Sequence, residues 1–84
     1  MNKDFMLFNL REASEEILRI IHEVESDPEY GYGDYVVGMT HLYHHINTAW
    51  NARGVPEDRA RQCSEQDFFR WRQFPSIEEI YLGQ

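Results

Sequence analysis

Cysteine is nearly absent from this chain, which contains only Cys63 among its 84 residues. A single thiol cannot form a disulfide within the chain, and zinc sites that need two or more thiolates are excluded within one copy. Such usage is typical of proteins in a reducing compartment, so we expect a cytoplasmic protein. We interpret Cys63 itself as a small hydrophobic residue packed on the inner side of a helix, rather than as a nucleophile.

Long hydrophobic runs are also missing. The first apolar stretch comprises only residues 5–8 and directly follows Lys3 and Asp4. A stretch of that length is too short for the core of a signal peptide or for a membrane span. We therefore expect no membrane association.

Basic residues are few, with 8 Lys and Arg against 15 Asp and Glu, and the formal net charge is -7. The average surface potential repels phosphate backbones, so we expect no binding to nucleic acid. The arginines of residues 53–72 are interleaved with acidic residues, which favours salt bridges in water over an anion site. A weaker alternative treats the acidic surface as a nucleic-acid mimic, although the carboxylates are spread over all segments of the chain.

What the sequence does contain is enough apolar material for one core. Hydrophobic residues make up 42% and aromatic residues 14% of the chain. A chain of this length has room for one domain, so we expect a single helical domain over residues 1–84. No phosphate loop, nucleophile elbow or dinucleotide fingerprint is present, and we assign no catalytic residues and expect no enzyme.

Apolar residues recur at steps of three and four, which predicts a first helix over Leu10–Glu25 with one buried face. Asn9 supplies its N-cap, and Glu12 three residues later completes a capping box. Phe5 and Phe8 fall outside this stripe. We therefore expect them in an extended N-terminal arm that packs on the core or on a second chain.

A loop over residues 26–34 leads to a second helix over Tyr35–Arg53. Asp34 is its predicted N-cap, and Gly54 ends it in the left-handed conformation that glycine adopts without steric cost. Gly38 weakens the helix, so we expect another group to approach the backbone closely there. The residues expected to face the core are Tyr35, Met39, Leu42, Ile46, Ala49 and Trp50.

The remaining chain predicts short elements. A third helix is expected over 56–63, and Ser64 either caps a fresh turn or lies within one helix that continues to Gln73, before Pro75. A short fourth helix or turn is expected over 76–82. The sequence thus predicts an all-α fold: a small three- to four-helix bundle with two longer antiparallel helices and a short aromatic-rich C-terminal helix or turn.

Three histidines, His41, His44 and His45, lie on the second predicted helix. His41 and His45 are four residues apart, a spacing that can present two imidazoles to zinc or another divalent transition metal, and His22 is the most plausible third ligand. The glutamate of the metalloprotease helix motif is absent. Our leading interpretation is that the histidines are surface and boundary polar residues, and metal binding is the alternative.

Aromatic residues exceed what one face of a short helix can bury, so they either close the ends of the small core or form an interaction surface. The candidate partner-binding residues are Phe5, Phe8, Tyr30, Tyr32, Phe69 and Trp71. Our first hypothesis is therefore a small acidic protein-interaction module, an adaptor or regulator that docks a protein partner through exposed aromatic side chains. The small core also makes a homodimer plausible.

Overall fold

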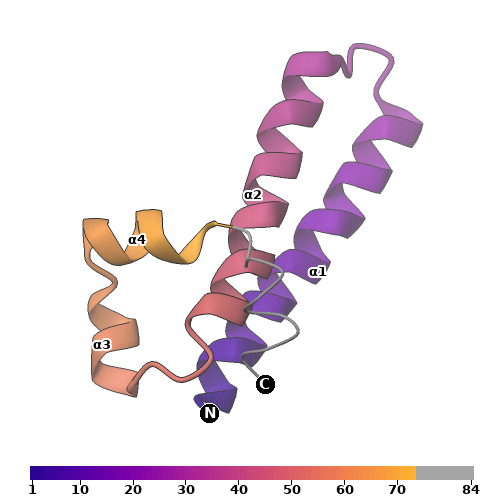
Figure 1. The fold of residues 1–84 in the computed structure, drawn as a ribbon. Coiled ribbons are helices and arrows are strands. Elements are labelled where there is room, and N and C mark those ends of the chain that lie inside the picture. Colours follow the sequence, from indigo (N-terminus) through magenta and orange to yellow (C-terminus); the bar gives the residue numbers. More distant parts are fainter. Residues whose placement is uncertain (74–84) are drawn as a thin grey trace, which may run out of the picture.

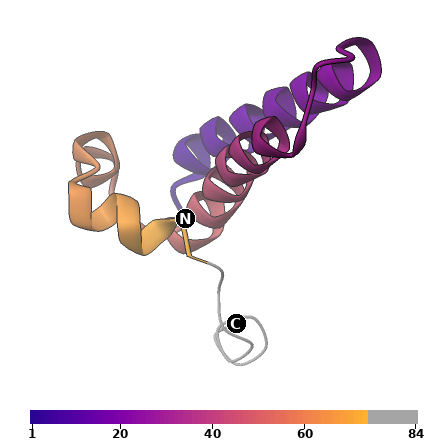
Figure 2. The ribbon, with the colours of Figure 1, turned by 90° about the horizontal axis from the view of Figure 1, so that it is seen from above.

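The computed structural model describes residues 1–73, and the helix or turn expected over 76–82 lies outside them. The described chain folds as α1 (Lys3–Ser26), α2 (Tyr32–Asn51), α3 (Glu57–Gln62) and α4 (Glu65–Trp71), which confirms the all-α prediction. The long helices α1 and α2 form an antiparallel hairpin (Figure 1). The short helices α3 and α4 lie to one side of this hairpin (Figure 2). No helix in the described part of the chain is long and apolar enough to span a bilayer.

Helix α1 begins at Lys3, a full two turns earlier than the sequence predicts, so the extended arm is a wrong prediction. The true N-cap is Asn2, whose side chain accepts a hydrogen bond from the Phe5 amide at 3.1 Å. Asn2 also donates its side-chain amide to the Val55 carbonyl at 3.0 Å. Contacts with the segment after α2 therefore support the extra turns, and Phe5 and Phe8 are helical.

Helix α2 begins at Tyr32 rather than Tyr35, and its N-cap is Gly31 rather than Asp34. The Asp34 carboxylate instead accepts a hydrogen bond from the Gly31 amide at 3.0 Å. The left-handed cap expected at Gly54 is also wrong. The chain leaves α2 by a turn in which the Val55 amide donates to the Ala52 carbonyl, and this turn needs no positive φ.

The core between α1 and α2 is thin. It contains Ala13 and Ile20 from α1 and Leu42 and Ala49 from α2, all less than 9% exposed. Of the residues expected to face the core, Tyr35 and Ile46 remain about half exposed, so that expectation is wrong for them. A single neighbouring helix covers only a narrow stripe of α2, whereas the apolar arc of α2 is wider.

The close approach expected at Gly38 is confirmed. Gly38 is buried against Ile20 of α1, and a Cβ atom at Gly38 would lie 3.0 Å from Ile20 Cγ1. Any side chain larger than hydrogen at this position would push against α1. Glycine therefore allows the present close spacing of the two helices.

Ser64 starts a new helix, which resolves the two alternatives left by the sequence. Its Oγ accepts a hydrogen bond from the Asp67 amide at 3.1 Å, and Cys63 before it adopts a left-handed φ of 33°. Cys63 is exposed, so its interpretation as a packed hydrophobic residue is wrong. It occupies the turn between α3 and α4, where its side chain has no inner face to pack against.

Helix α4 is held on α2 by amide side chains. Asn47 donates to the Arg72 carbonyl at 2.5 Å, and Asn51 donates to the Trp71 carbonyl at 2.7 Å. The buried Trp71 ring meets Phe5 of α1 edge to face, with centroids 6.0 Å apart. These contacts connect α4 to both long helices.

The salt bridges expected among the arginines of this region are present for two pairs. Arg59 donates to Asp67 at 2.9 Å and Arg61 donates to Glu57 at 2.5 Å. The first pair ties α3 to α4, and the second lies within α3 on the surface. Both are ion pairs within the chain, as the interleaved charges predict.

Candidate functional site

An apolar stripe runs along α1 beside its contact with α2. Its members recur at steps of seven, four and three residues, which places them on one side of the helix. They are Leu10, Ile17, Ile21 and Val24. Each is between 41% and 54% exposed, although a packed helix normally covers such residues.

A matching stripe runs along α2, at steps of four, four and three residues. It comprises Tyr35, Met39, Tyr43 and Ile46. Tyr35, Tyr43 and Ile46 are 40–44% exposed, and Met39 is half-buried. Leu42 and Ala49 are the residues of α2 that face α1. The stripe lies about a quarter-turn around the helix axis from them.

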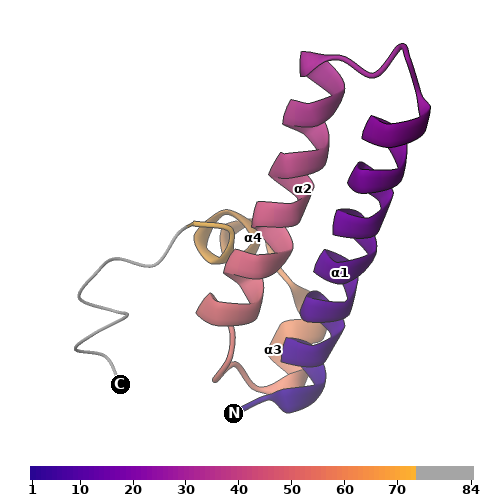
Figure 3. The ribbon, with the colours of Figure 1, turned by 90° about the vertical axis from the view of Figure 1, so that its right-hand side faces the viewer.

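The two stripes lie on the same side of the hairpin. In α1, the stripe is likewise rotated by about a quarter-turn from the α2-facing residues Ala13 and Ile20. Because both helices are right-handed and run antiparallel, equal rotations from their shared contact lead to the same side. We call the eight residues of the two stripes the open face. Figure 3 views the hairpin from the side on which neither α3 nor α4 packs.

The open face contains no charged residue. The partly covered glutamates of α1, Glu12, Glu16 and Glu23, fall on the other side of the contact with α2. The arginine at Arg19 pairs with two of these, Glu16 and Glu23, and so belongs to that charged side as well. The hairpin therefore has one charged side and one apolar side.

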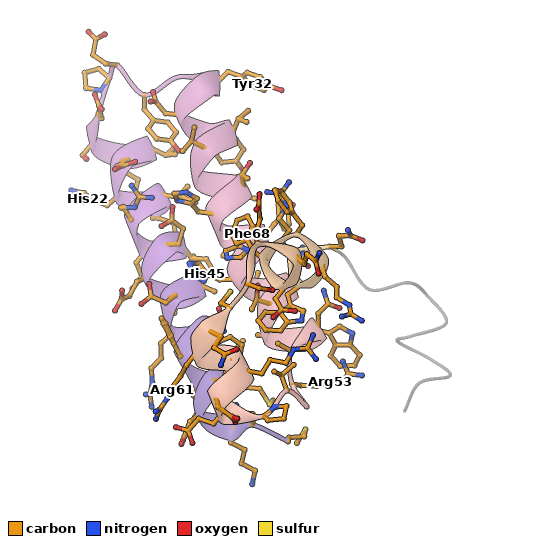
Figure 4. All side chains as sticks on the ribbon, turned by 90° about the vertical axis from the view of Figure 1, so that its left-hand side faces the viewer. His22, Tyr32, His45, Arg53, Arg61 and Phe68 are labelled. Atoms are coloured by element: carbon orange, nitrogen blue, oxygen red, sulfur yellow. The ribbon has the colours of Figure 1, made fainter. Side chains whose placement is uncertain are left out.

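The six candidate partner-binding residues do not form one patch. Phe8, Tyr32 and Phe69 are exposed, by 48%, 84% and 47%, but they belong to three separate helices. Tyr32 lies at the loop end of the hairpin (Figure 4). The other three, Phe5, Tyr30 and Trp71, are partly or fully covered within the chain.

Sequence reasoning missed the open face because it assigned the same apolar stripes to the core. The signal was nevertheless present: each stripe is broader than one contacting helix can cover. A comparison of the width of the apolar arc with the number of helices that can cover it would have indicated an additional partner.

A second candidate site is a cleft of about 730 Å³ between α2 and α4. The half-buried His44 contacts Phe68 of α4 with ring centroids 4.6 Å apart. The Arg72 guanidinium lies over the rings of Phe68 and Phe69. His41 and His45 also line the cleft. The site combines aromatic surface with imidazole and guanidinium groups.

Burial is the main cause that lowers the pKa of His44, and the positive charges of His45, Arg72 and His41 lower it further. His45 has a polar partner from the opposite helix, since its Nδ1 lies 3.2 Å from Asn9 Oδ1. The burial of two of the histidines is therefore greater than the sequence predicts. His44 and His45 are half-buried, whereas His41 is exposed.

The structure does not bring His22 together with the other candidate metal ligands. His22 lies near the loop end of α1, and His45 lies farther down the hairpin (Figure 4). Within residues 1–73 there is no group of three or more His, Cys, Asp or Glu side chains placed to hold a metal ion. Metal binding by His41, His45 and His22 stays a prediction of the sequence alone.

Comparisons of the chain with family models, with curated proteins and with solved structures found no match.

Proposed function

We propose that this protein is a non-enzymatic interaction module, a small acidic adaptor or regulator that docks a protein partner through the open face. The observation that carries the proposal is the exposure of two adjacent apolar stripes along the whole hairpin. This replaces the scattered aromatic residues as the main contact surface. A cytoplasmic location is part of the proposal, and the single free thiol at Cys63 supports it.

The size of the open face supports docking. Seven of its residues are 40–54% exposed. With about 200 Å² for a fully exposed apolar residue, they present on the order of 600 Å² of continuous surface, at the upper end of patches found on monomers. Patches of this size, bordered by polar residues, mark interaction sites more often than chance exposure does.

The shape of the open face indicates the kind of partner. Two apolar stripes side by side on neighbouring helices form a surface onto which a further helix can pack. Tyr35 and Tyr43 add large aromatic side chains, which can contact apolar groups of a partner. An apolar helical surface, on another protein or on a second copy in a homodimer, satisfies these requirements.

The proposal can be tested with a displayed library of amphipathic helical peptides, selected against the full chain at low surface density. We expect enrichment of peptides with apolar residues at steps of three and four. Ile21→Lys should weaken their binding by about tenfold or more, because it places a charge in the apolar open face. Val37→Lys is the matched control, since Val37 is 58% exposed but lies outside the open face.

Circular dichroism of both variants would verify that each remains helical. Absence of enriched peptides from a chain that is monomeric, or equal loss of binding in Ile21→Lys and Val37→Lys, would contradict the proposal. Enrichment that depends on Ile21 and not on Val37 would support it.

A further inference from the structure

We infer that the open face is occupied by a second copy of this chain, so that two α1–α2 hairpins stack face to face as a four-helix bundle. This inference rests on the proposed function and names its partner. Three properties of the described residues lead to it: the thin core, the width of the apolar arcs, and the position of the charges.

The first property is the thin core. The buried apolar side chains of the hairpin are Ala13, Ile20, Leu42 and Ala49, and none of the aromatic side chains of the hairpin is buried. A small domain whose described part has so thin a core gains stability from association. Small domains obtain it from disulfides, metals or association, and a single cysteine excludes the first within one copy.

The second property is the width of the apolar arc on each long helix. In a four-helix bundle every helix has two adjacent neighbours, about a quarter-turn apart around its axis. Helix α1 presents Ile20 to α2 and, about a quarter-turn further round, presents Ile17 and Ile21 to the open side. In α2, Met39 is likewise rotated by about a quarter-turn from Gly38, which faces Ile20 of α1. Each helix thus carries apolar surface toward the open side in addition to the residues that it packs against the other long helix.

A second copy fits this geometry without any further change. The open face consists of two antiparallel helices with the same kind of residue on each. A two-fold axis that lies in the plane of this face therefore places the open face of one copy against the open face of the other. Each copy would contribute on the order of 600 Å², which gives about 1,200 Å² in total. That value reaches the lower limit of stable protein interfaces.

The third property is the position of the charges. Each copy has a formal net charge of -7, and close approach of two such chains is unfavourable if their carboxylates meet. The open face contains no carboxylate, and Glu12, Glu16 and Glu23 lie on the other side of α1. Stacking through the open face therefore keeps these three glutamates of each copy away from the interface.

Sedimentation equilibrium of the full chain tests the inference directly. We expect a mass of twice 10.1 kDa at micromolar concentrations, dissociating on dilution. Ile21→Lys should raise the dissociation constant roughly 100-fold, because two lysines would enter one symmetric interface. Val37→Lys should leave it within about threefold of the original value.

A second measurement does not depend on the folding of a variant. The thermal midpoint of the unaltered dimer should rise with protein concentration, because association stabilises the folded state by mass action. A midpoint independent of concentration, together with a monomer mass, would overturn the inference. A dimer that Ile21→Lys leaves intact would also overturn it.

One competing occupant belongs to the same chain: the apolar side chains of residues 74–84. If they cover the open face, the unaltered chain is a monomer and the double variant Ile77→Lys, Ile80→Lys becomes a dimer, which overturns the inference. A monomer that binds the amphipathic peptides through Ile21 contradicts the second copy but keeps the proposed function. A monomer that binds no peptide contradicts both.

Discussion

Ile20 of α1 lies over the backbone of Gly38 in α2. An added Cβ atom at Gly38 would be 3.0 Å from Ile20 Cγ1 and 3.2 Å from Ile20 Cδ1, both tighter than ordinary contacts. Both residues are buried where the two long helices meet. The separation of α1 from α2, and so the shape of the open face beside this contact, depends on the absence of a side chain at Gly38.

Gly38→Ala should therefore destabilise the protein even though alanine is the better helix former. The change gains up to about 1 kcal/mol in helix propensity, but the crowding against Ile20 costs about 1–3 kcal/mol. We expect a net loss of about 1 kcal/mol in the free energy of unfolding, measured by urea titration.

Gly33→Ala is the matched control, since it lies in the first turn of the same helix with no atom within 4 Å of its added Cβ. It should stabilise by up to about 1 kcal/mol. Equal stabilisation by the two substitutions would show that the Ile20 contact is loose.

Local signals explain which features could be read from the sequence. An isolated glycine in a helical pattern pointed to the close approach at Gly38, and Ser64 offered the cap that starts α4. Both depend on residues within one turn of the chain. The periodicity that identified the two long helices is local in the same sense.

The misplaced start of α1 shows where such signals are insufficient. Asn2 and Asn9 are both acceptable N-caps by residue type. The choice between them depends on contacts across the fold: Asn2 with Val55, and Asn9 with His45. No pattern within a single helix contains that information.

The open face was missed for a related reason. The recurrence of Ile17, Ile21 and Val24 indicates that this side of α1 is apolar, but not which neighbour covers it. In the hairpin α2 covers only the part that includes Ala13 and Ile20. The number of neighbours is a property of the assembled fold.

The ion pair between Arg59 and Asp67 should contribute to acid sensitivity. The hydrogen bond from Arg59 is the largest cause that lowers the pKa of Asp67 below its ordinary value of 3.8, and the bond from Ser64 acts in the same direction. The Asp67 carboxylate thus binds a proton less readily in the folded state than in the unfolded state. The stabilisation is complete above 3.8 and is lost as the pH falls through the lowered pKa.

Urea midpoints measured from about pH 6 to about pH 2 would test this. The Asp67→Asn variant should lack the loss of stability that protonation of Asp67 causes. Arg59→Ala should lower the midpoint at neutral pH more than Arg61→Ala does. Arg61 and Glu57 form a pair that is 76% and 66% exposed, which is the arrangement of least consequence for stability. Similar losses from both arginine variants would argue against a special role for Asp67.

His44 gives a separate pH dependence nearer to neutrality. Burial, and then His45, Arg72 and His41, lower its pKa below the ordinary 6.5, so the folded state favours the neutral imidazole. Its contribution to stability is complete above 6.5 and falls as the pH drops below that value. The ring protons of His44 should titrate with a midpoint below 6.5 in NMR spectra.

His44→Phe should remove the part of the stability change that falls between pH 6.5 and the lowered pKa of His44, while keeping the ring contact with Phe68. A His44 midpoint at or above 6.5, or an unchanged stability profile in the variant, would contradict the assignment.

The attachment of α4 should depend on two asparagines. Asn47 is 3% exposed and donates to the Arg72 carbonyl, and Asn51 donates to the carbonyls of Trp71 and Gln73. These carbonyls lie at the C-terminal end of α4, where helix carbonyls lack intrahelical donors. Asn47→Ala should therefore cost about 1–3 kcal/mol, because it removes a buried amide donor that attaches this end to α2.

Hydrogen exchange separates loss of this attachment from general unfolding. In Asn47→Ala and Asn51→Ala the amides of α4 should exchange faster, while those of α1 near Ile20 keep their protection. Gln73→Ala removes an exposed hydrogen bond to the Phe69 carbonyl within the same segment and should change little. If exchange instead rises equally in α1 and α4, the hairpin and α4 unfold as one unit, and the asparagines stabilise the whole domain rather than the position of α4.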